Sequence, residues 1–209
     1  MSKRTEIPVI VGITGGSGSI LAQSIIDHLL LKDISVIVVA SAAARMVWQE
    51  EMEESWGEAL ERWGEYDHFT HYPNSYIGAP IASGTYPTAG MVIVPCSMTT
   101  LSAISHGFAD NLIRRAADVC LKERKPLVLM PRETPLNAIH LDNMASLSRM
   151  GVTVLPPVPA FYLKPKSIED VVAFLANRAL DALNVIETLP ENLMYNGPSI
   201  SSSGRSSKS

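Results

Sequence analysis

Met91-Val92-Ile93-Val94-Pro95-Cys96-Ser97 opens the most informative stretch of this chain, which continues to Glu133. A second apolar run, Leu127-Val128-Leu129-Met130, stops abruptly at Pro131-Arg132-Glu133. Short apolar runs that end in polar residues are typical of buried parallel strands. Polar residues that follow such strands meet at one edge of the sheet, where open α/β sheets bind ligands. Because this edge carries hydroxyls, cations and a carboxylate, we expect a ligand rich in phosphate.

The rest of the chain extends the same pattern in both directions. Strands are expected at 9–13, 34–40, 91–94, 127–130 and 152–155, and helices at about 19–31, 42–64, 99–106, 111–123, 136–150 and 167–186, with 65–90 irregular. This alternation predicts a doubly wound parallel α/β sheet, Rossmann-like or flavodoxin-like, with helices on both faces. We expect one domain over residues 1–190 and a C-terminal extension over 191–209, disordered from about residue 198.

Composition excludes several classes of protein. The 209 residues carry a net charge of −4, which argues against a general nucleic-acid binder. The sequence contains no apolar run long enough to span a membrane and no signal peptide, so we expect a soluble, cytoplasmic protein. The five histidines lack metal-ligand spacing, and no metal site is expected. Cys96 and Cys120 lie in apolar contexts and are interpreted as buried thiols.

A glycine-rich loop containing Gly15, Gly16 and Gly18 connects the first strand to the first helix. Its backbone N–H groups can face an anion or a flat ring, although glycines that merely permit a tight turn are the alternative. The spacing is not G-x-G-x-x-G, and the second strand ends at Ala40-Ser41-Ala42 without the acidic residue that a dinucleotide site needs. This pattern disfavours NAD.

Hydroxyls and cations follow the later strands. Ser97, Thr99 and Thr100 lie at a strand-to-helix junction, where they can cap the helix or bind phosphate. Arg132 directly follows a buried strand, and its guanidinium suits phosphate. Arg115, Asp118 and Lys122 fall at i, i+3 and i+7, a spacing that usually marks a solvated ion-pair face.

Two further residues stand near the C-terminus. Arg178 lies at the margin of the apolar stripe of the last helix, so we expect it to point toward the body and to need an anionic partner. Tyr162 follows Pro159-Ala160-Phe161 and can present its phenol to the same place, with a core tyrosine as the alternative.

Six motifs occur in order: Thr14-Gly15-Gly16-Ser17-Gly18, Ala82-Ser83-Gly84, Pro95-Cys96-Ser97-Met98-Thr99-Thr100, Arg115-Ala116-Ala117-Asp118-Val119 with Lys122-Glu123, Pro131-Arg132-Glu133-Thr134-Pro135, and Pro156-Pro157-Val158-Pro159-Ala160-Phe161-Tyr162. In this combination the chain resembles the flavin prenyltransferase family from about Val9 to about Ile186. The resemblance implies a dodecamer that joins a dimethylallyl group from dimethylallyl phosphate to N5 and C6 of reduced FMN without a metal. The prenylated FMN then serves a separate UbiD-type decarboxylase.

The resemblance also assigns roles to residues. Those similar to the family's FMN contacts are Gly15, Gly16, Ser17, Ser41, Ser97, Met98, Thr99, Thr100 and Arg132. Those on the dimethylallyl-phosphate side are Ser83, Gly84, Arg115, Lys122, Tyr162 and Arg178, and the catalytic group is Ser17, Glu51 and Glu133. Counting from Ser41 selects Glu51 as the proton relay and leaves Glu50 open. Tyr195 is the aromatic residue nearest to the position of a family tryptophan. The guanidinium groups of residues 115, 132 and 178 are expected around one pocket.

Two other functions remain as alternatives. One is an FMN-dependent cysteine decarboxylase of the same fold group. Those proteins carry a Pro-Ala-Ser-Ala-Asn-Thr segment where this chain has Pro95-Cys96-Ser97-Met98-Thr99-Thr100, and a Pro-x-Met-Asn motif that has no equivalent here. The other is a non-catalytic accessory subunit that delivers FMN to a decarboxylase unchanged. The cations matched to a second phosphate favour the transferase over mere carriage.

Overall fold

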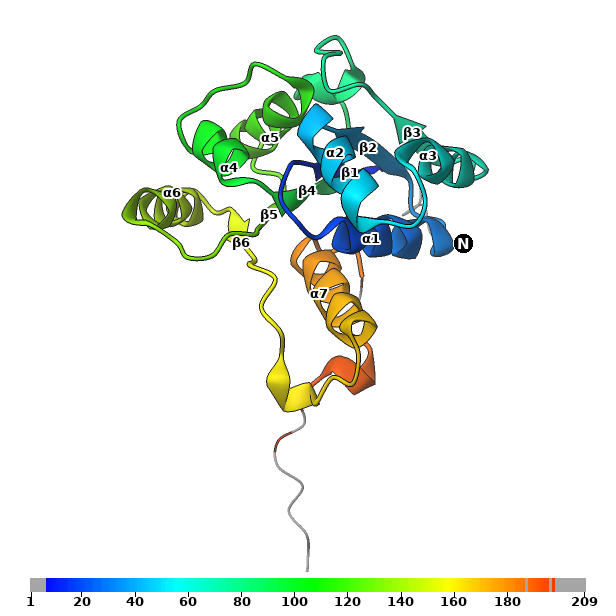
Figure 1. Cartoon of the computed structure of the whole chain (residues 1–209). Helices are drawn as coiled ribbons and strands as arrows, with labels where there is room; N and C mark the ends of the chain where they lie inside the picture. The colour runs from blue at the N-terminus through cyan, green and yellow to red at the C-terminus, as the bar shows by residue number, and fades with distance from the viewer. Residues whose placement is uncertain (1–6, 187, 196, 198–209) are drawn as a thin grey trace, which may run out of the picture.

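Parallel strands form the centre of the fold in the computed structural model, which describes residues 7–186, 188–195 and 197 (Figure 1). In this part of the chain they make one sheet in the order β3-β2-β1-β4-β5-β6. Their bounds are β1 Val9–Ile13, β2 Val36–Ala40, β3 Phe69–His71, β4 Gly90–Cys96, β5 Leu127–Pro131 and β6 Thr153–Val154. The order confirms the predicted doubly wound sheet. It reverses between β1 and β4, and such a reversal leaves a crevice at the carboxyl ends of the strands.

The inner strands are apolar throughout because both faces of the sheet are covered. β1, β2, β4 and β5 are completely buried. β3 was not predicted, since the sequence analysis left 65–90 irregular. It has three half-buried residues and pairs only with β2, starting at Phe69 opposite Val36. A strand that short shows no recognisable periodicity. β6 is likewise shorter than the predicted 152–155.

Helices cover both faces of the sheet, as predicted. They are α1 Ser19–Leu31, α2 Ala42–Glu51, α3 Trp56–Gly64, α4 Met98–Ser105, α5 Leu112–Lys122, α6 Ala138–Arg149 and α7 Ile168–Ala182, with 3-10 turns η2 Pro80–Ala82, η3 Phe161–Leu163 and η4 Glu191–Leu193. α1, α2, α3 and α7 share one core cluster with alternate residues of β1, and α4, α5 and α6 share the other. None of these helices is long and apolar enough to cross a membrane.

The single helix predicted over 42–64 is wrong, because the chain breaks between α2 and α3. Met52 has an extended backbone with φ −109° and ψ 147°, and Ser55 starts α3 as an N-cap. Glu58 completes a capping box by accepting the N–H of Ser55 at 2.7 Å. The break lets Trp48, Trp56 and Trp63 meet edge to face, with ring centroids 5.2 to 5.9 Å apart.

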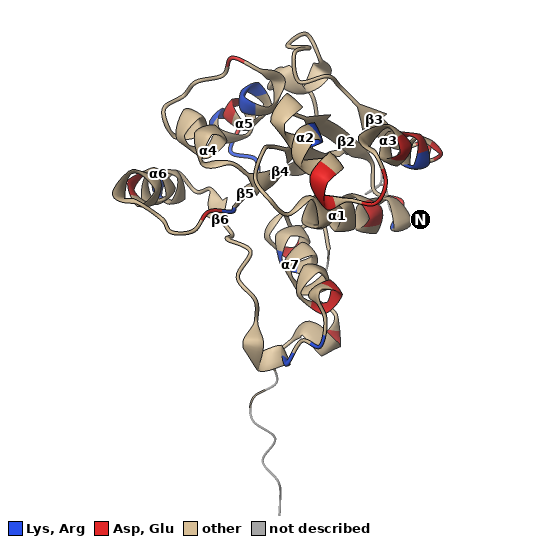
Figure 2. Ribbon diagram, in the orientation of Figure 1, with Lys and Arg blue, Asp and Glu red and all other residues tan. Residues whose placement is uncertain are grey.

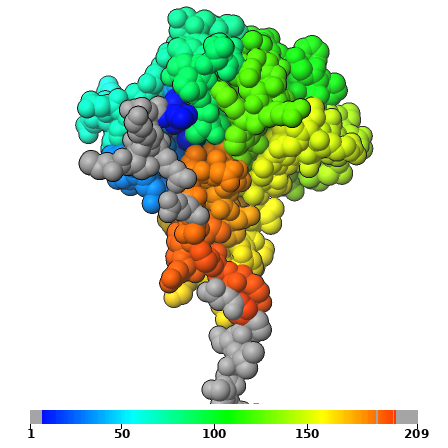
Figure 3. Space-filling model, turned by 180° about the vertical axis from the view of Figure 1, so that it is seen from behind, coloured from blue at the N-terminus to red at the C-terminus, as the bar shows by residue number. Residues whose placement is uncertain are grey.

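The C-terminal part of the described chain leaves the body and returns to it. In Figure 1 the segment after β6 descends to η3, and α7 runs back to pack against α1. Figure 3 shows the same arrangement from behind, with α7 in orange below the body and the yellow segment beside it. The predicted disorder from residue 198 falls outside the described residues and stays a prediction.

Candidate functional site at the carboxyl edge of the sheet

Thr14 joins the two strands that flank the crevice. Its N–H and its hydroxyl both donate to the carbonyl oxygen of Pro95, at 3.1 and 2.9 Å. Its Oγ1 accepts the backbone N–H of Ser97 at 2.7 Å. The side chain is buried, with 3% of the residue exposed. Sequence reasoning placed Thr14 in a motif but not in the site. A threonine directly after the first strand was the available signal.

The predicted flavin residues lie along one continuous edge. The N–H of Ser41, after β2, donates to the carbonyl of Ile13 at 3.0 Å. The N–H of Arg132, after β5, donates to the carbonyl of Cys96 at 3.4 Å. Together with the Thr14 bonds, these contacts connect the ends of β2, β1, β4 and β5. The structure therefore places the loop 15–17, Ser41, residues 97–100 and Arg132 side by side along the sheet.

Packing requires a glycine at position 15, whether or not a ligand binds there. A Cβ on Gly15 would lie 2.6 Å from the Cβ of Ala43, closer than carbon atoms approach. The glycine thus lets the first loop pass against the start of α2, an approach that any larger residue would block.

Ser41 and Ser97 are both helix caps. The Oγ of Ser41 accepts the N–H of Ala44 at 3.0 Å, and the Oγ of Ser97 accepts the N–H of Thr100 at 3.3 Å. The cap interpretation of Ser97 is therefore confirmed. Met98 and Thr99 open α4, and the first N–H groups of a helix have no partner within it. This end of α4 remains suited to an anion.

At the start of α1, the corresponding N–H groups are occupied by the carboxylate of Glu51. Its carboxylate accepts the N–H of Gly18 at 2.9 and 3.2 Å and the N–H of Ser19 at 2.8 Å. Burial raises the pKa of Glu51, but hydrogen bonds from the Ser17 side chain and from the backbone of Ser19 and Gly18 outweigh it and lower the pKa below its ordinary value. Both candidates left open are exposed, and Glu51 is the one whose carboxylate accepts hydrogen bonds from the first loop.

A second group of predicted residues gathers around η2 and α5. The Nε of Arg115 donates to the carbonyl of Ala82 at 3.1 Å. A Cβ on Gly84 would collide with Lys122 Nζ and Glu123 Oε1, which form an ion pair with each other. Ser83 and Gly84 therefore lie against the end of α5, and a larger residue at position 84 would displace the Lys122 and Glu123 side chains.

The predicted ion-pair face of α5 is present in part. Arg115 pairs with Asp118 at 2.8 Å, one helical turn away. Lys122 pairs with its neighbour Glu123 rather than with Asp118. Lys122 also ends α5 close to the start of β5, so it lies near the amino edge of the sheet, opposite Ser97.

Tyr162 and Arg178 form a third group on the descending segment and α7. Tyr162 is 55% exposed, so the core-tyrosine alternative is wrong. Its ring meets Tyr195 edge to face, with centroids 5.4 Å apart. Arg178 finds its anionic partner within its own helix, at Asp181, 2.7 Å away.

One chain does not gather the three guanidinium groups into one pocket. Arg115 is on α5, which covers one face of the sheet, and Arg178 is on α7, which covers the other. Arg132 and Glu133 follow β5 at the carboxyl edge, and both are exposed. Glu133 accepts the N–H of Thr134 at 3.0 Å. The doubly wound topology separates α5 from α7 by the thickness of the sheet.

Both cysteines are buried, which does not suit a nucleophilic role. Burial raises the pKa of Cys96 and of Cys120 to about 12, so both thiols stay protonated at neutral pH. Within the described ranges, no cluster of three or more His, Cys, Asp or Glu could hold a metal ion.

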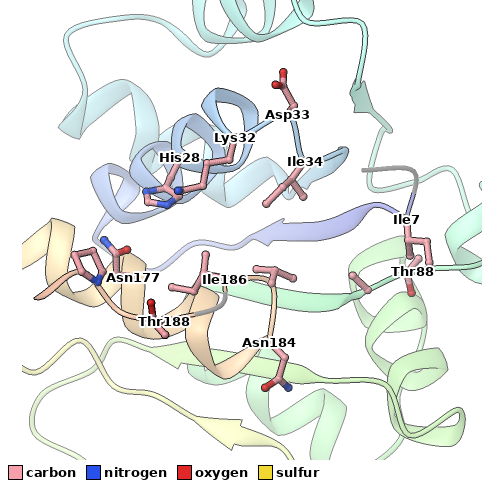
Figure 4. Close-up of a pocket in the computed structure, with 13 residues that line it drawn as sticks. Ile7, His28, Lys32, Asp33, Ile34, Thr88, Asn177, Asn184, Ile186 and Thr188 are labelled. Carbon is pink, nitrogen blue, oxygen red and sulfur yellow. The ribbon is translucent and has the colours of Figure 1, made fainter. Parts of the chain in front are cut away.

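A cavity of about 780 Å³ lies away from this site (Figure 4). His28 and Lys32 line it from the end of α1, and Ile7 and Thr88 line it from just before β1 and β4. These positions place the cavity at the amino edge of the sheet. It contains none of the predicted site residues.

Comparison with known proteins shows the family. The family model described as Flavoprotein matches residues 1–180. The flavin prenyltransferase UbiX of Alkalihalophilus pseudofirmus is 46% identical over 195 residues, which cover 90% of this chain and 97% of that protein. The chain belongs to the flavin prenyltransferase family. As a family member it is an enzyme, a transferase of the flavoprotein class.

Solved structures agree with this assignment. A UbiX protein described as AnUbiX (PadA1), in complex with FMN and dimethylallyl pyrophosphate, has a TM-score of 0.80 at 39% identity, covering 85% of this chain and 92% of its own. A dodecameric FMN-dependent UbiX-like decarboxylase from Escherichia coli O157:H7 also has a TM-score of 0.80, at 40% identity, covering 85% and 94%. The FMN-dependent cysteine decarboxylase SpaF, 17% identical with a TM-score of 0.56, shares the fold alone with this flavin prenyltransferase.

Proposed function

We propose that this flavin prenyltransferase transfers the dimethylallyl group of dimethylallyl phosphate to N5 and C6 of reduced FMN. The prenylated FMN is the product, and a UbiD-type decarboxylase receives it. One observation carries the proposal: the ends of four adjacent strands are joined by hydrogen bonds into one edge that bears Ser41, Ser97 and Arg132. The related structure with FMN and dimethylallyl pyrophosphate supports it.

The donors along this edge suit the phosphate of FMN. The first N–H groups of α1 already serve Glu51, so they are not available to a second anion. The start of α4, the hydroxyl of Ser41 and the guanidinium of Arg132 remain, and these are anion-binding groups. We assign the FMN phosphate to them and the isoalloxazine ring to the loop at Gly15, Gly16 and Ser17.

The phosphate of dimethylallyl phosphate leaves when its bond to the allylic carbon breaks. Reduced FMN supplies the electron-rich N5 and C6 that take the dimethylallyl carbons. Lys122, Tyr162 and Arg178 stabilise the negative charge on the departing phosphate, with Arg115, Ser83 and Gly84 around it and Glu133 beside Arg132 at its edge. Holding the two reactants in register provides much of the acceleration.

The final bond, at C6, forms as the π bond of the transferred group opens: its middle carbon takes up a proton and C6 releases one, so the step needs a proton acceptor. Glu51 is assigned this role because its carboxylate stands at the first loop with the Ser17 hydroxyl beside it. The lowered pKa keeps the Glu51 carboxylate ionised at neutral pH, which is the form that a proton acceptor needs, and makes it a weak base.

Completion of the site requires more than one chain. Because α5 and α7 cover opposite faces of the sheet, the groups around Lys122 and around Arg178 reach one flavin only if neighbouring subunits contribute them. We therefore propose a homo-oligomer with composite sites, and we favour a dodecamer, the state of the UbiX-like protein from Escherichia coli O157:H7.

The test is anaerobic incubation with reduced FMN and dimethylallyl phosphate, followed by mass spectrometry of the extracted flavin. The expected result is a mass increase of one dimethylallyl unit, unaffected by a metal chelator. A parallel reaction with the diphosphate decides the donor, and addition of the product to an apo UbiD-type decarboxylase tests the recipient. Folded protein that binds FMN and returns it unchanged would instead establish the accessory subunit that only delivers FMN.

A further inference from the structure

Three residues on one face of α1 make polar contacts with the segment from α2 to α3. Ser19, Gln23 and Asp27 are spaced four residues apart, so they lie in a row along this face. The N–H of Ser19 donates to Glu51, and the Nε2 of Gln23 donates to the carboxylate of Glu54 at 2.6 Å. Figure 2 shows the acidic end of α2 beside the start of α1, and acidic and basic positions together on α3.

Arg62 on α3 donates hydrogen bonds to both Glu54 and Asp27. Its Nε and one terminal nitrogen donate to the Glu54 carboxylate at 3.1 and 2.6 Å, and its other terminal nitrogen donates to Asp27 at 2.9 Å. Asp27 also accepts the indole N–H of Trp63 at 2.6 Å. A guanidinium that bridges two carboxylates fixes both the distance and the angle between the elements that carry them.

The turn between α2 and α3 also makes a hydrogen bond with the core. The carbonyl oxygen of Glu54 accepts the indole N–H of Trp48 at 3.0 Å. Trp48 is completely buried, so this contact joins the turn to the core. Glu51 ends α2 immediately before this turn, and its position follows that of the turn.

We infer that Glu54 and Arg62 are positioning residues that hold the Glu51 carboxylate on the first N–H groups of α1, beside the first loop of the flavin site. Neither side chain touches that loop. The inference rests on the proposed function, in which Glu51 accepts the proton released from the flavin. A lost Glu54–Arg62 contact frees the turn, and Glu51 moves away from Gly18 and Ser19.

The variants are Arg62→Ala, Arg62→Lys and Glu54→Gln, with Glu61→Ala as a matched control. Glu61 is an exposed carboxylate on α3 beside Arg62 in the sequence. Lysine keeps the charge but cannot bridge both carboxylates, so Arg62→Lys should be intermediate and remains informative if Arg62→Ala folds poorly. The groups that titrate along this face are Asp27, Glu51 and Glu54, with Glu50 and Glu53 beside Glu51 in the sequence.

Hydrogen–deuterium exchange reports how well the N–H groups that donate to Glu51 are protected, and it does so independently of catalysis. In Arg62→Ala, the peptide covering residues 14–25 should exchange faster, whereas Glu61→Ala should match the wild type. Unchanged exchange in Arg62→Ala and Glu54→Gln would overturn the inference.

Turnover tests whether the position of Glu51 matters for catalysis. Arg62→Ala should lower turnover roughly 10-fold or more while FMN retention stays unchanged, since displacing a reacting group by about 1 Å can cost this much. The acidic limb of its pH–rate profile should move to higher pH, because Glu51 loses the hydrogen bonds that favour its ionised form. In the Glu51→Gln background the same substitution should have no further effect.

The double variant separates the possible failures. An equal loss from Arg62→Ala in both backgrounds would show that Arg62 does not act through Glu51, and the inference would fall. Faster exchange in Arg62→Ala together with wild-type turnover in Glu51→Gln would leave the positioning intact and refute the proposed role of Glu51.

Discussion

The hydroxyl of Thr14 accepts the backbone N–H of Ser97 at 2.7 Å and thereby joins the end of β1 to the end of β4. This contact lies where the strand order reverses, between the first loop and the start of α4. The same hydroxyl donates to the carbonyl of Pro95. The buried Thr14 side chain thus adds two hydrogen bonds to the backbone contact between the two loops to which the flavin is assigned.

Thr14→Val should destabilise the protein and weaken FMN retention. Valine keeps the shape but leaves the Ser97 N–H and the Pro95 carbonyl without the hydroxyl, at a cost of about 1–3 kcal/mol for a buried group. Thermal unfolding and the fraction of FMN retained after gel filtration measure the two effects. Thr14→Ser keeps the hydroxyl and serves as the control. Equal behaviour of the two variants would contradict the assignment.

Glu51→Gln should retain both ligands yet slow turnover on the order of 100-fold, the usual loss for a missing proton-transfer group. Glu50→Gln is the matched control, because Glu50 is exposed and adjacent in the chain. Single-turnover kinetics with reduced FMN and dimethylallyl phosphate measure the step. A slow Glu50→Gln and a normal Glu51→Gln would reverse the assignment.

The stability that Glu51 contributes should depend on pH. Its folded-state pKa is lowered, so the contribution is complete above the ordinary value of 4.5 and is lost as pH falls through the lower folded value. The difference in Tm between the wild type and Glu51→Gln should therefore be present at neutral pH and disappear in acid. A difference that grows as the pH falls would show that the carboxylate is not stabilised in its ionised form.

Gly84→Ala should impair use of the prenyl phosphate. The added Cβ would collide with Lys122 Nζ and Glu123 Oε1, so Lys122 has to move. We expect a higher KM for dimethylallyl phosphate and unchanged FMN retention. Gly64→Ala is the control, because a Cβ there meets no atom within 4 Å. A normal KM for Gly84→Ala would remove Lys122 from the site.

Arg178→Ala should likewise weaken use of the prenyl phosphate and spare FMN. The residue is on α7, away from the carboxyl edge to which the flavin is assigned. KM for dimethylallyl phosphate and the FMN content of the purified protein are the measurements, with Arg149→Ala in α6 as the control. Loss of FMN from the Arg178 variant would show that it belongs to the flavin site.

The sequence predicted the central strands and the edge they form because burial on both faces demands continuous apolar runs. Polar residues after such runs meet at one edge by topology alone, so Ser41, Ser97 and Arg132 could be placed together. β3 escaped prediction since its three residues pair with one neighbour and are only half buried. The break between α2 and α3 escaped because Ser55 and Glu58 also suit a continuous helix surface.

Local pattern thus established the doubly wound architecture and the covering helices, since each depends on neighbours a few positions apart. The contact of Glu51 with the first loop was different in kind. It depended on where α2 stops and on a hydrogen bond to Ser19, 32 residues away in the chain. The separation of Arg115 from Arg178 was also a matter of packing, because sequence spacing does not reveal which face of the sheet a helix covers.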